Sequence, residues 1–203
     1  MQLQDQRVLV TGATAGIGQE AAKLFARRGA SVVITGRDTE RGAQTVAAIE
    51  AEGGRAEFIA ADLNHIKSAQ RLAEHAGEVD VLINNAAATR TRFAPTLEQD
   101  VESFNTVFDV NVRAPFFLIQ ESVRIMRREK IAGSIVNIQS MSAHGGQPFI
   151  AAYCASKGDA DPQRRPFAAQ IPHPRQRPQY RLDVDAGRGQ HPEGLSRREG
   201  RLA

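Results

Sequence analysis

The sequence has one cysteine among its 203 residues and no hydrophobic run of membrane-spanning length. A single thiol, Cys154, cannot form a disulfide within the chain or supply a multi-cysteine metal site. No apolar stretch approaches the roughly 20 residues that a transmembrane helix needs. The first residues also lack the basic-then-apolar order of a secretory signal peptide. These absences predict a cytoplasmic protein that binds no metal and does not associate with membranes.

An excess of charge of one sign is absent from most of the chain. Lys plus Arg number 26 and Asp plus Glu number 23, and the whole excess lies in residues 159–203. Residues 1–158 hold 17 basic and 17 acidic residues, whereas residues 159–203 hold nine Arg, six acids and six of the nine Pro. With few large apolar residues, this last segment cannot bury enough surface to offset its ordering entropy. We expect a single domain over residues 1–158 and a disordered tail over 159–203.

Short apolar runs alternate with helical periodicity across residues 1–158. Strands buried on both faces are typical of a parallel sheet that is covered by helices on both sides. The pattern therefore predicts a doubly wound α/β fold. The expected strands are residues 7–11, 31–35, 58–60, 79–83 and 134–138. The first expected helix follows the first strand and ends at Gly29, and three more are expected over about residues 40–52, 97–112 and 115–130.

A glycine-rich turn, Thr-Gly-Ala-Thr-Ala-Gly-Ile-Gly over residues 11–18, connects the first strand to the first helix. Gly12 permits a tight turn, Gly16 lets the backbone approach a pyrophosphate, and Gly18 lets helix and strand pack closely. The amides at the positive end of the following helix favour a diphosphate. The turn predicts a Rossmann-type dinucleotide site.

The spacing of these glycines resembles the Thr-Gly-x-x-x-Gly-x-Gly motif of the short-chain dehydrogenase/reductase superfamily. Later segments agree with that family in order and spacing over about residues 5–158. The Asn-Asn-Ala-Ala of residues 84–87 matches the family's Asn-Asn-Ala-Gly, with Ala87 in place of Gly. The resemblance implies an oxidoreductase that interconverts a small alcohol and a carbonyl by hydride transfer. The cofactor-binding residues that it implies are Gly12, Thr14, Gly16, Ile17, Gly18, Arg37, Asp62, Leu63, Asn84, Ala86, Tyr153 and Lys157.

Four residues match the family's catalytic positions: Asn111, Ser140, Tyr153 and Lys157. A helix would place Tyr153 and Lys157 on one face, and a nearby cation stabilises a phenolate. The resemblance implies that Tyr153 exchanges a proton with the substrate oxygen and that Lys157 binds the nicotinamide ribose. Ser140 would hydrogen-bond the substrate oxygen, and Asn111 would support a water-mediated proton path. Ser142 lies nearby, but its spacing fits the family less well.

The end of the second strand bears on the choice of cofactor. An acid there usually binds the ribose 2′-hydroxyl of NAD, whereas a nearby Arg accommodates the 2′-phosphate of NADP. Here Gly36 stands at the position of the acid, Arg37 follows it, and Asp38 is expected to start the next loop. The sequence favours NADP(H), with NAD(H) as the alternative.

The resemblance stops after Gly158, where Pro162 would truncate the helix that carries Lys157. Back-translation of residues 175–183, read one base later, permits Val-Asn-Gly-Leu-Asn-Ile-Gly-Trp-Met, which resembles the family's missing strand. We therefore hypothesise a frame shift near codons 158–159. Such a chain could be an inactive or cofactor-binding-only family member, without the homo-oligomeric assembly of the intact family.

The competing interpretation of the tail is an Arg/Pro-rich arm that binds nucleic acid or an acidic partner. Nine Arg offset by six acids, with no Lys and no aromatic pattern for base stacking, make a weak footprint for such an arm. The sequence therefore favours a small-molecule substrate over a nucleic-acid partner.

Overall fold

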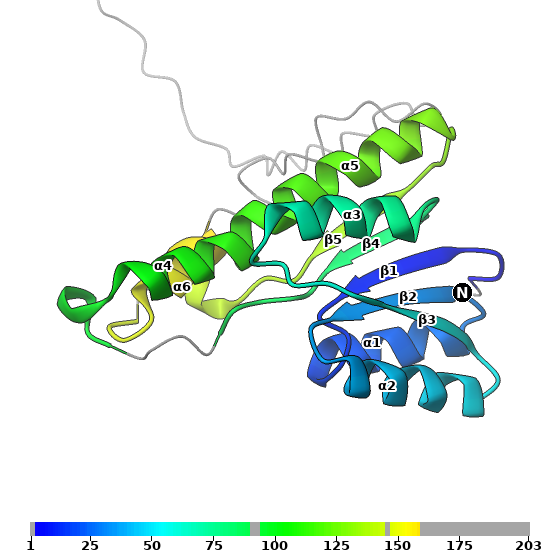
Figure 1. The fold of residues 1–203 in the computed structure, drawn as a ribbon, viewed down its shortest axis with the longest axis horizontal. Coiled ribbons are helices and arrows are strands. Elements are labelled where there is room, and N and C mark those ends of the chain that lie inside the picture. Colours follow the sequence, from blue (N-terminus) through cyan, green and yellow to red (C-terminus); the bar gives the residue numbers. More distant parts are fainter. Residues whose placement is uncertain (1–2, 90–93, 145–146, 159–203) are drawn as a thin grey trace, which may run out of the picture.

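A computed structural model describes residues 3–89, 94–144 and 147–158 of the chain (Figure 1). Its centre is a five-stranded parallel sheet with the strand order β3-β2-β1-β4-β5. The strands are β1 (Arg7–Thr11), β2 (Ser31–Gly36), β3 (Arg55–Ala60), β4 (Val81–Asn84) and β5 (Ser134–Asn137). This arrangement confirms the predicted doubly wound α/β fold. The predicted disordered tail lies outside the described residues.

Helices cover both faces of the sheet (Figure 1). One face is covered by α1 (Gly16–Arg27) and α2 (Thr39–Ala51), and the other by α3 (Ile66–Ala76) and α5 (Ala114–Arg128). The short helices α4 (Val101–Phe108) and α6 (Ala151–Gly158) pack against each other beyond the carboxyl ends of the strands. The loops at this end of the sheet therefore lie between the two helical layers and the α4–α6 pair.

The central strands bury side chains on both faces, as their unbroken apolar sequences predict. In β1, Leu9 packs toward α3 and α5, whereas Val8 and Val10 pack toward α1 and α2. All three side chains are fully buried. The two apolar layers fix the sheet between its helices, so that the carboxyl ends of β1 and β4 are held side by side.

Strand β3 begins three residues earlier than the predicted 58–60. It lies at an edge of the sheet, and its residues alternate between exposed and partly buried positions. Polar residues such as Arg55 and Glu57 occupy the exposed positions. An edge strand needs only one apolar face, so the first half of β3 is not a continuous apolar run and does not have the sequence pattern of a buried strand.

The two helices predicted over 97–112 and 115–130 are not separate. A 3₁₀ turn (Thr96–Glu98) precedes α4, which runs through a π-helical turn (Asp109–Arg113) directly into α5. Pro115 has no amide hydrogen to donate to the Asn111 carbonyl four residues earlier, so the regular α-helical pattern is interrupted there. The proline changes the helix pitch instead of ending the helix.

None of the helices in the described part of the chain is long and apolar enough to cross a membrane. Residues 3–89, 94–144 and 147–158 also contain no group of three or more His, Cys, Asp or Glu placed to hold a metal ion. The absence of a metal site from the whole protein stays a prediction.

Candidate active site

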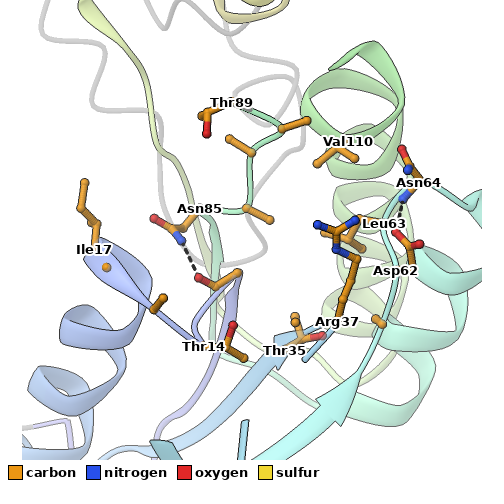
Figure 2. Close-up of a pocket in the computed structure, with 18 of the residues that line it drawn as sticks. Thr14, Ile17, Thr35, Arg37, Asp62, Leu63, Asn64, Asn85, Thr89 and Val110 are labelled. Atoms are coloured by element: carbon orange, nitrogen blue, oxygen red, sulfur yellow. Dashed lines mark hydrogen bonds between the residues drawn. The ribbon is translucent and has the colours of Figure 1, made fainter. Parts of the chain in front are cut away.

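A cavity of about 600 Å³ opens at the carboxyl ends of the strands (Figure 2). It lies where the strand order reverses between β1 and β4, which is the usual ligand position in doubly wound sheets. The loops that follow β1, β2, β3 and β4 all contribute to it. Its lining residues are Gly12, Thr14, Ala15, Gly16, Ile17, Thr35, Gly36, Arg37, Ala61, Asp62, Leu63, Asn64, Asn85, Ala86, Ala87, Ala88, Thr89, Thr106 and Val110.

The glycine-rich turn forms one wall of this cavity. Gly12 has a φ of +64°, and a Cβ atom there would lie 2.8 Å from the Ala86 Cα. Gly16 has a φ of +58°, and nothing lies within 4 Å of the position of its Cβ. Helix α1 begins at Gly16 without an acidic residue in its first turn or a side-chain cap. Its first amides and its positive end are therefore available to an anion in the cavity.

Gly18 and Asn84, two of the predicted cofactor ligands, are not among the lining residues. A Cβ at Gly18 would collide with the Asn85 amide, so this glycine serves packing. The side-chain Nδ2 of Asn84 donates a hydrogen bond to Asn137 Oδ1 at 2.9 Å and thereby links β4 to β5.

Asn85, which sequence reasoning missed, does line the cavity. Its Nδ2 donates to the carbonyls of Thr11 (2.9 Å) and Gly12 (3.1 Å). Figure 2 shows the Asn85 side chain with a hydrogen bond in the cavity wall. It therefore holds the glycine turn against the loop after β4. Its position beside Asn84 in the Asn-Asn-Ala-Ala segment was the available signal.

The end of β2 presents Arg37 to the cavity (Figure 2). A Cβ at Gly36 would lie 2.6 Å from Thr14 Cγ2, so the chain has no room for a larger residue there without moving Thr14. Asp38 starts α2 and does not begin a loop. Its carboxylate accepts a hydrogen bond from the Arg41 backbone amide (3.0 Å) and forms an ion pair with the Arg41 guanidinium (2.8 Å). The amide hydrogen bond chiefly lowers the pKa of Asp38 below its usual value. This acid is committed to the helix cap.

The opposite wall is built by residues that follow β3. The Asp62 carboxylate accepts the Asn64 amide hydrogen at 3.0 Å, which fixes the turn after the strand. Leu63 is buried beside it, and Val110 of the π-helical turn also lines the cavity. Sequence reasoning identified Asp62 and Leu63 and missed Val110, because the π-helical turn that brings Val110 to the cavity has no simple sequence pattern.

Helix α6 carries Tyr153 and Lys157 one turn apart. The Lys157 ammonium donates to the Ile138 carbonyl at 2.9 Å and lies 5.9 Å from the centre of the Tyr153 ring. Lys157 is buried, and this burial lowers its pKa below the usual 10.5. The structure thus brings a desolvated cation close to a partly exposed phenol.

Asn111 and Ser140 come from the segments that pack against α6. The Asn111 Oδ1 accepts the Ala88 amide hydrogen (2.7 Å), and its Nδ2 donates to Ser156 Oγ (3.0 Å). Its side chain is therefore committed to protein partners. Ser140 Oγ lies 2.7 Å from Ser142 Oγ and accepts the Ser142 amide hydrogen at 3.3 Å. Ser142, which the spacing disfavoured, is the direct partner of Ser140.

The four residues at the family's catalytic positions therefore meet around α6, through its contacts with the π-helical turn and with the turn Met141–Ala143. None of the four is among the lining residues of the cavity. The described site has two parts, a cavity suited to an anionic ligand and an adjacent cluster of Asn, Ser, Tyr and Lys.

A family model described as short chain dehydrogenase matches residues 6–162. The chain belongs to this family, as the glycine spacing and the Tyr-x-x-x-Lys segment predicted.

The names of two curated relatives give different substrates. A 3beta-hydroxysteroid dehydrogenase from Mediterraneibacter gnavus is 40% identical over 159 residues, which cover 75% of this chain and 56% of the relative. A galactitol 2-dehydrogenase from Agrobacterium fabrum is 34% identical over 158 residues, which cover 77% of this chain and 61% of the relative. The chain thus spans between half and two thirds of the length of these relatives.

Solved structures share the fold. A short chain dehydrogenase/reductase family protein is 44% identical, with a TM-score of 0.74, and the match covers 81% of this chain and 68% of the other. A metagenomic short-chain oxidoreductase in complex with NADP is 35% identical, with a TM-score of 0.71, over 76% of this chain and 71% of the other.

Proposed function

We propose that the protein is an NADP(H)-dependent oxidoreductase that interconverts an alcohol and a carbonyl by hydride transfer. One observation carries the proposal: the Tyr153–Lys157 pair lies on a helix that packs against the segments of Ser140 and Asn111, beside a cavity with a glycine-rich wall. The named dehydrogenases among the relatives support this class of reaction. Because these relatives are named for different substrates, we propose only the class of substrate for this chain, an alcohol or a carbonyl compound.

The chemistry of the cavity fits NADP(H). The open backbone at Gly16 and the first amides of α1 suit a diphosphate, and Asp62 and Leu63 flank the place where an adenine would lie. Arg37 supplies a cation for a 2′-phosphate. The acid that would favour NAD(H) is absent at Gly36, and Asp38 is engaged in capping α2. NADP bound in a solved relative supports the same choice.

In the proposed mechanism, NADP(H) held at Gly16 and Arg37 would supply or accept a hydride at the substrate carbon. During carbonyl reduction, the Tyr153 hydroxyl gives its proton to the substrate oxygen as that carbon receives the hydride, and alcohol oxidation reverses both transfers. The Ser140 hydroxyl donates a hydrogen bond to the same oxygen. The Lys157 ammonium stabilises the phenolate that remains. Asn111 holds the wall at Ala88, since its side chain is occupied there.

A second candidate function is cofactor binding without turnover. The family match ends at residue 162, and the chain spans only 56% of one curated relative's length. Residues 159–203 do not resemble the strands and the substrate loop with which the family continues. For the chain as written, we therefore expect cofactor binding with little turnover, and we expect full activity from a chain whose frame is restored after Gly158.

Turnover separates these two functions. NADPH consumption with a panel of aldehydes and ketones is measured for the 203-residue chain, the frame-restored chain and the Tyr153→Phe variant of each. We expect turnover in the restored chain and its loss on Tyr153→Phe. Rapid turnover by the 203-residue chain would refute the second function. Turnover that persists in the Tyr153→Phe variant of the restored chain would refute the proposed mechanism.

A further inference from the structure

Ser156 lies on α6 between Tyr153 and Lys157, and the residue is only 1% exposed. The mechanism above gives it no role. Its hydroxyl donates to the Tyr153 carbonyl at 2.8 Å and accepts a hydrogen bond from Asn111 Nδ2 at 3.0 Å. A serine that bonds back to its own helix in this way keeps its lone pairs for a partner outside the helix.

The partner continues the chain of hydrogen bonds into the cavity wall. Asn111 Oδ1 accepts the amide hydrogen of Ala88 at 2.7 Å, and Ala88 lines the cavity. Asn111 is itself only 8% exposed. Three segments that are distant in sequence therefore meet through buried hydrogen bonds: the loop after β4, the π-helical turn and α6.

We propose that Ser156 is a positioning residue whose hydroxyl, through Asn111, holds the Ala88 wall of the cavity in register with the helix that carries Tyr153 and Lys157. This inference rests on the proposed function, since it assigns the cavity to the cofactor and α6 to the proton transfer. Without the hydroxyl, the Asn111 Nδ2 loses its nearer acceptor in a buried place and keeps only the longer contact with the Ala88 carbonyl, at 3.5 Å. Asn111 then reorients toward water and releases the Ala88 amide.

The competing explanation is that a small side chain at residue 156 merely fits the tight contact between α6 and the π-helical turn. Valine and threonine have nearly the same shape, and only threonine carries a hydroxyl. Ser156→Val and Ser156→Thr therefore add the same volume but differ in the hydrogen bond. Ser156→Ala removes the hydroxyl and adds no volume.

The direct readout is the hydrogen-exchange protection of the Ala88 amide in the full 203-residue chain, measured by NMR without cofactor. The loss of one buried hydrogen bond predicts a fall of about tenfold in Ser156→Val and Ser156→Ala. In Ser156→Thr the protection stays within about twofold of the parent. Unchanged protection in Ser156→Ala would overturn the proposal, and this variant decides the matter even if the two larger side chains prevent folding.

A kinetic readout in the frame-restored chain tests the consequence for catalysis. We expect kcat to fall about tenfold in Ser156→Val, with the KM for NADPH within about threefold of the parent, because Gly16 and Arg37 are untouched. Ser156→Thr restores kcat. Failure of the proposed function gives a different result, because neither parent nor variants then bind or consume NADPH, while Ala88 exchange still reports on the hydrogen bonds.

Discussion

Gly16 combines a left-handed backbone conformation with a place in the proposed NADPH site. Its positive φ and the free space beside it are shared by Gly53, which lies at the end of α2 and away from the cavity. Gly16→Ala and Gly53→Ala should therefore each lower the free energy of unfolding by roughly 1–2 kcal/mol, the cost of a left-handed conformation. Only Gly16→Ala should also weaken NADPH binding, by more than about tenfold, because its methyl group occupies the path of the diphosphate.

Chemical denaturation gives the stability cost of each glycine variant, and calorimetric titration with NADPH gives the affinity. Gly53→Ala is the matched control for backbone strain. Equal NADPH affinities of the two variants would remove Gly16 from the proposed cofactor site.

Lys157 should make the stability of the folded chain depend on pH. Burial lowers the pKa of Lys157 in the folded chain below its usual 10.5, so the unfolded chain binds more protons at this residue between the two values. The free energy of unfolding contributed by Lys157 therefore rises with pH across that window. Urea unfolding measured as the pH is raised to 10.5 should show a rise in the free energy of unfolding of the parent relative to Lys157→Met, in which the titrating group is gone. If the free energies of unfolding of the two chains change in parallel with pH, the pKa of Lys157 is not lowered in the folded chain.

At the scale of elements, β5 is an edge of the described sheet and pairs there with β4 alone. Val136 on this strand is 44% exposed. An apolar edge strand can pair with another chain, and a lysine on it discourages that pairing. Val136→Lys should therefore reduce self-association of the 203-residue chain while changing its free energy of unfolding by less than about 0.5 kcal/mol.

Sedimentation velocity over a range of concentrations measures this association. Phe149→Lys is the control, because Phe149 is also exposed but lies outside the sheet. If both substitutions reduce association equally, general hydrophobicity is responsible and the β5 edge is not.

The elements that could be predicted from sequence are those with a local cause. The strands β1, β2 and β4 are unbroken apolar runs, and the turn that contains Gly12 and Gly16 needs glycine for its backbone. The π-helical turn could not be predicted, because Pro115 is compatible with both a helix start and a change of pitch. The separate tasks of Asn84 and Asn85 depend on strand pairing and loop packing, which no single segment encodes.

The whole molecule joins two parts of different composition. Its net charge of +3 lies in residues 159–203, and the family match ends at residue 162. The excess of basic residues therefore carries no information about what the cavity binds. A frame shift near codons 158–159 predicts that the sequenced gene contains one inserted or deleted base at this point, and that the restored chain has a higher unfolding midpoint than the 203-residue chain. A gene that encodes Asp159 onward in an intact frame would contradict this explanation.

The proposed function requires that the cavity at the carboxyl ends of β1 and β4 binds NADP(H). Calorimetric titration of the purified 203-residue chain with NADPH and with NADH measures this binding. Arg37→Ala is the variant, and Arg41→Ala is the control, because Arg41 is an exposed arginine that is paired with Asp38. We predict that the parent and Arg41→Ala bind NADPH at least about tenfold more tightly than NADH, and that Arg37→Ala loses this preference while its NADH affinity is unchanged. A parent chain that binds neither nucleotide, or that prefers NADH, would contradict the proposed function.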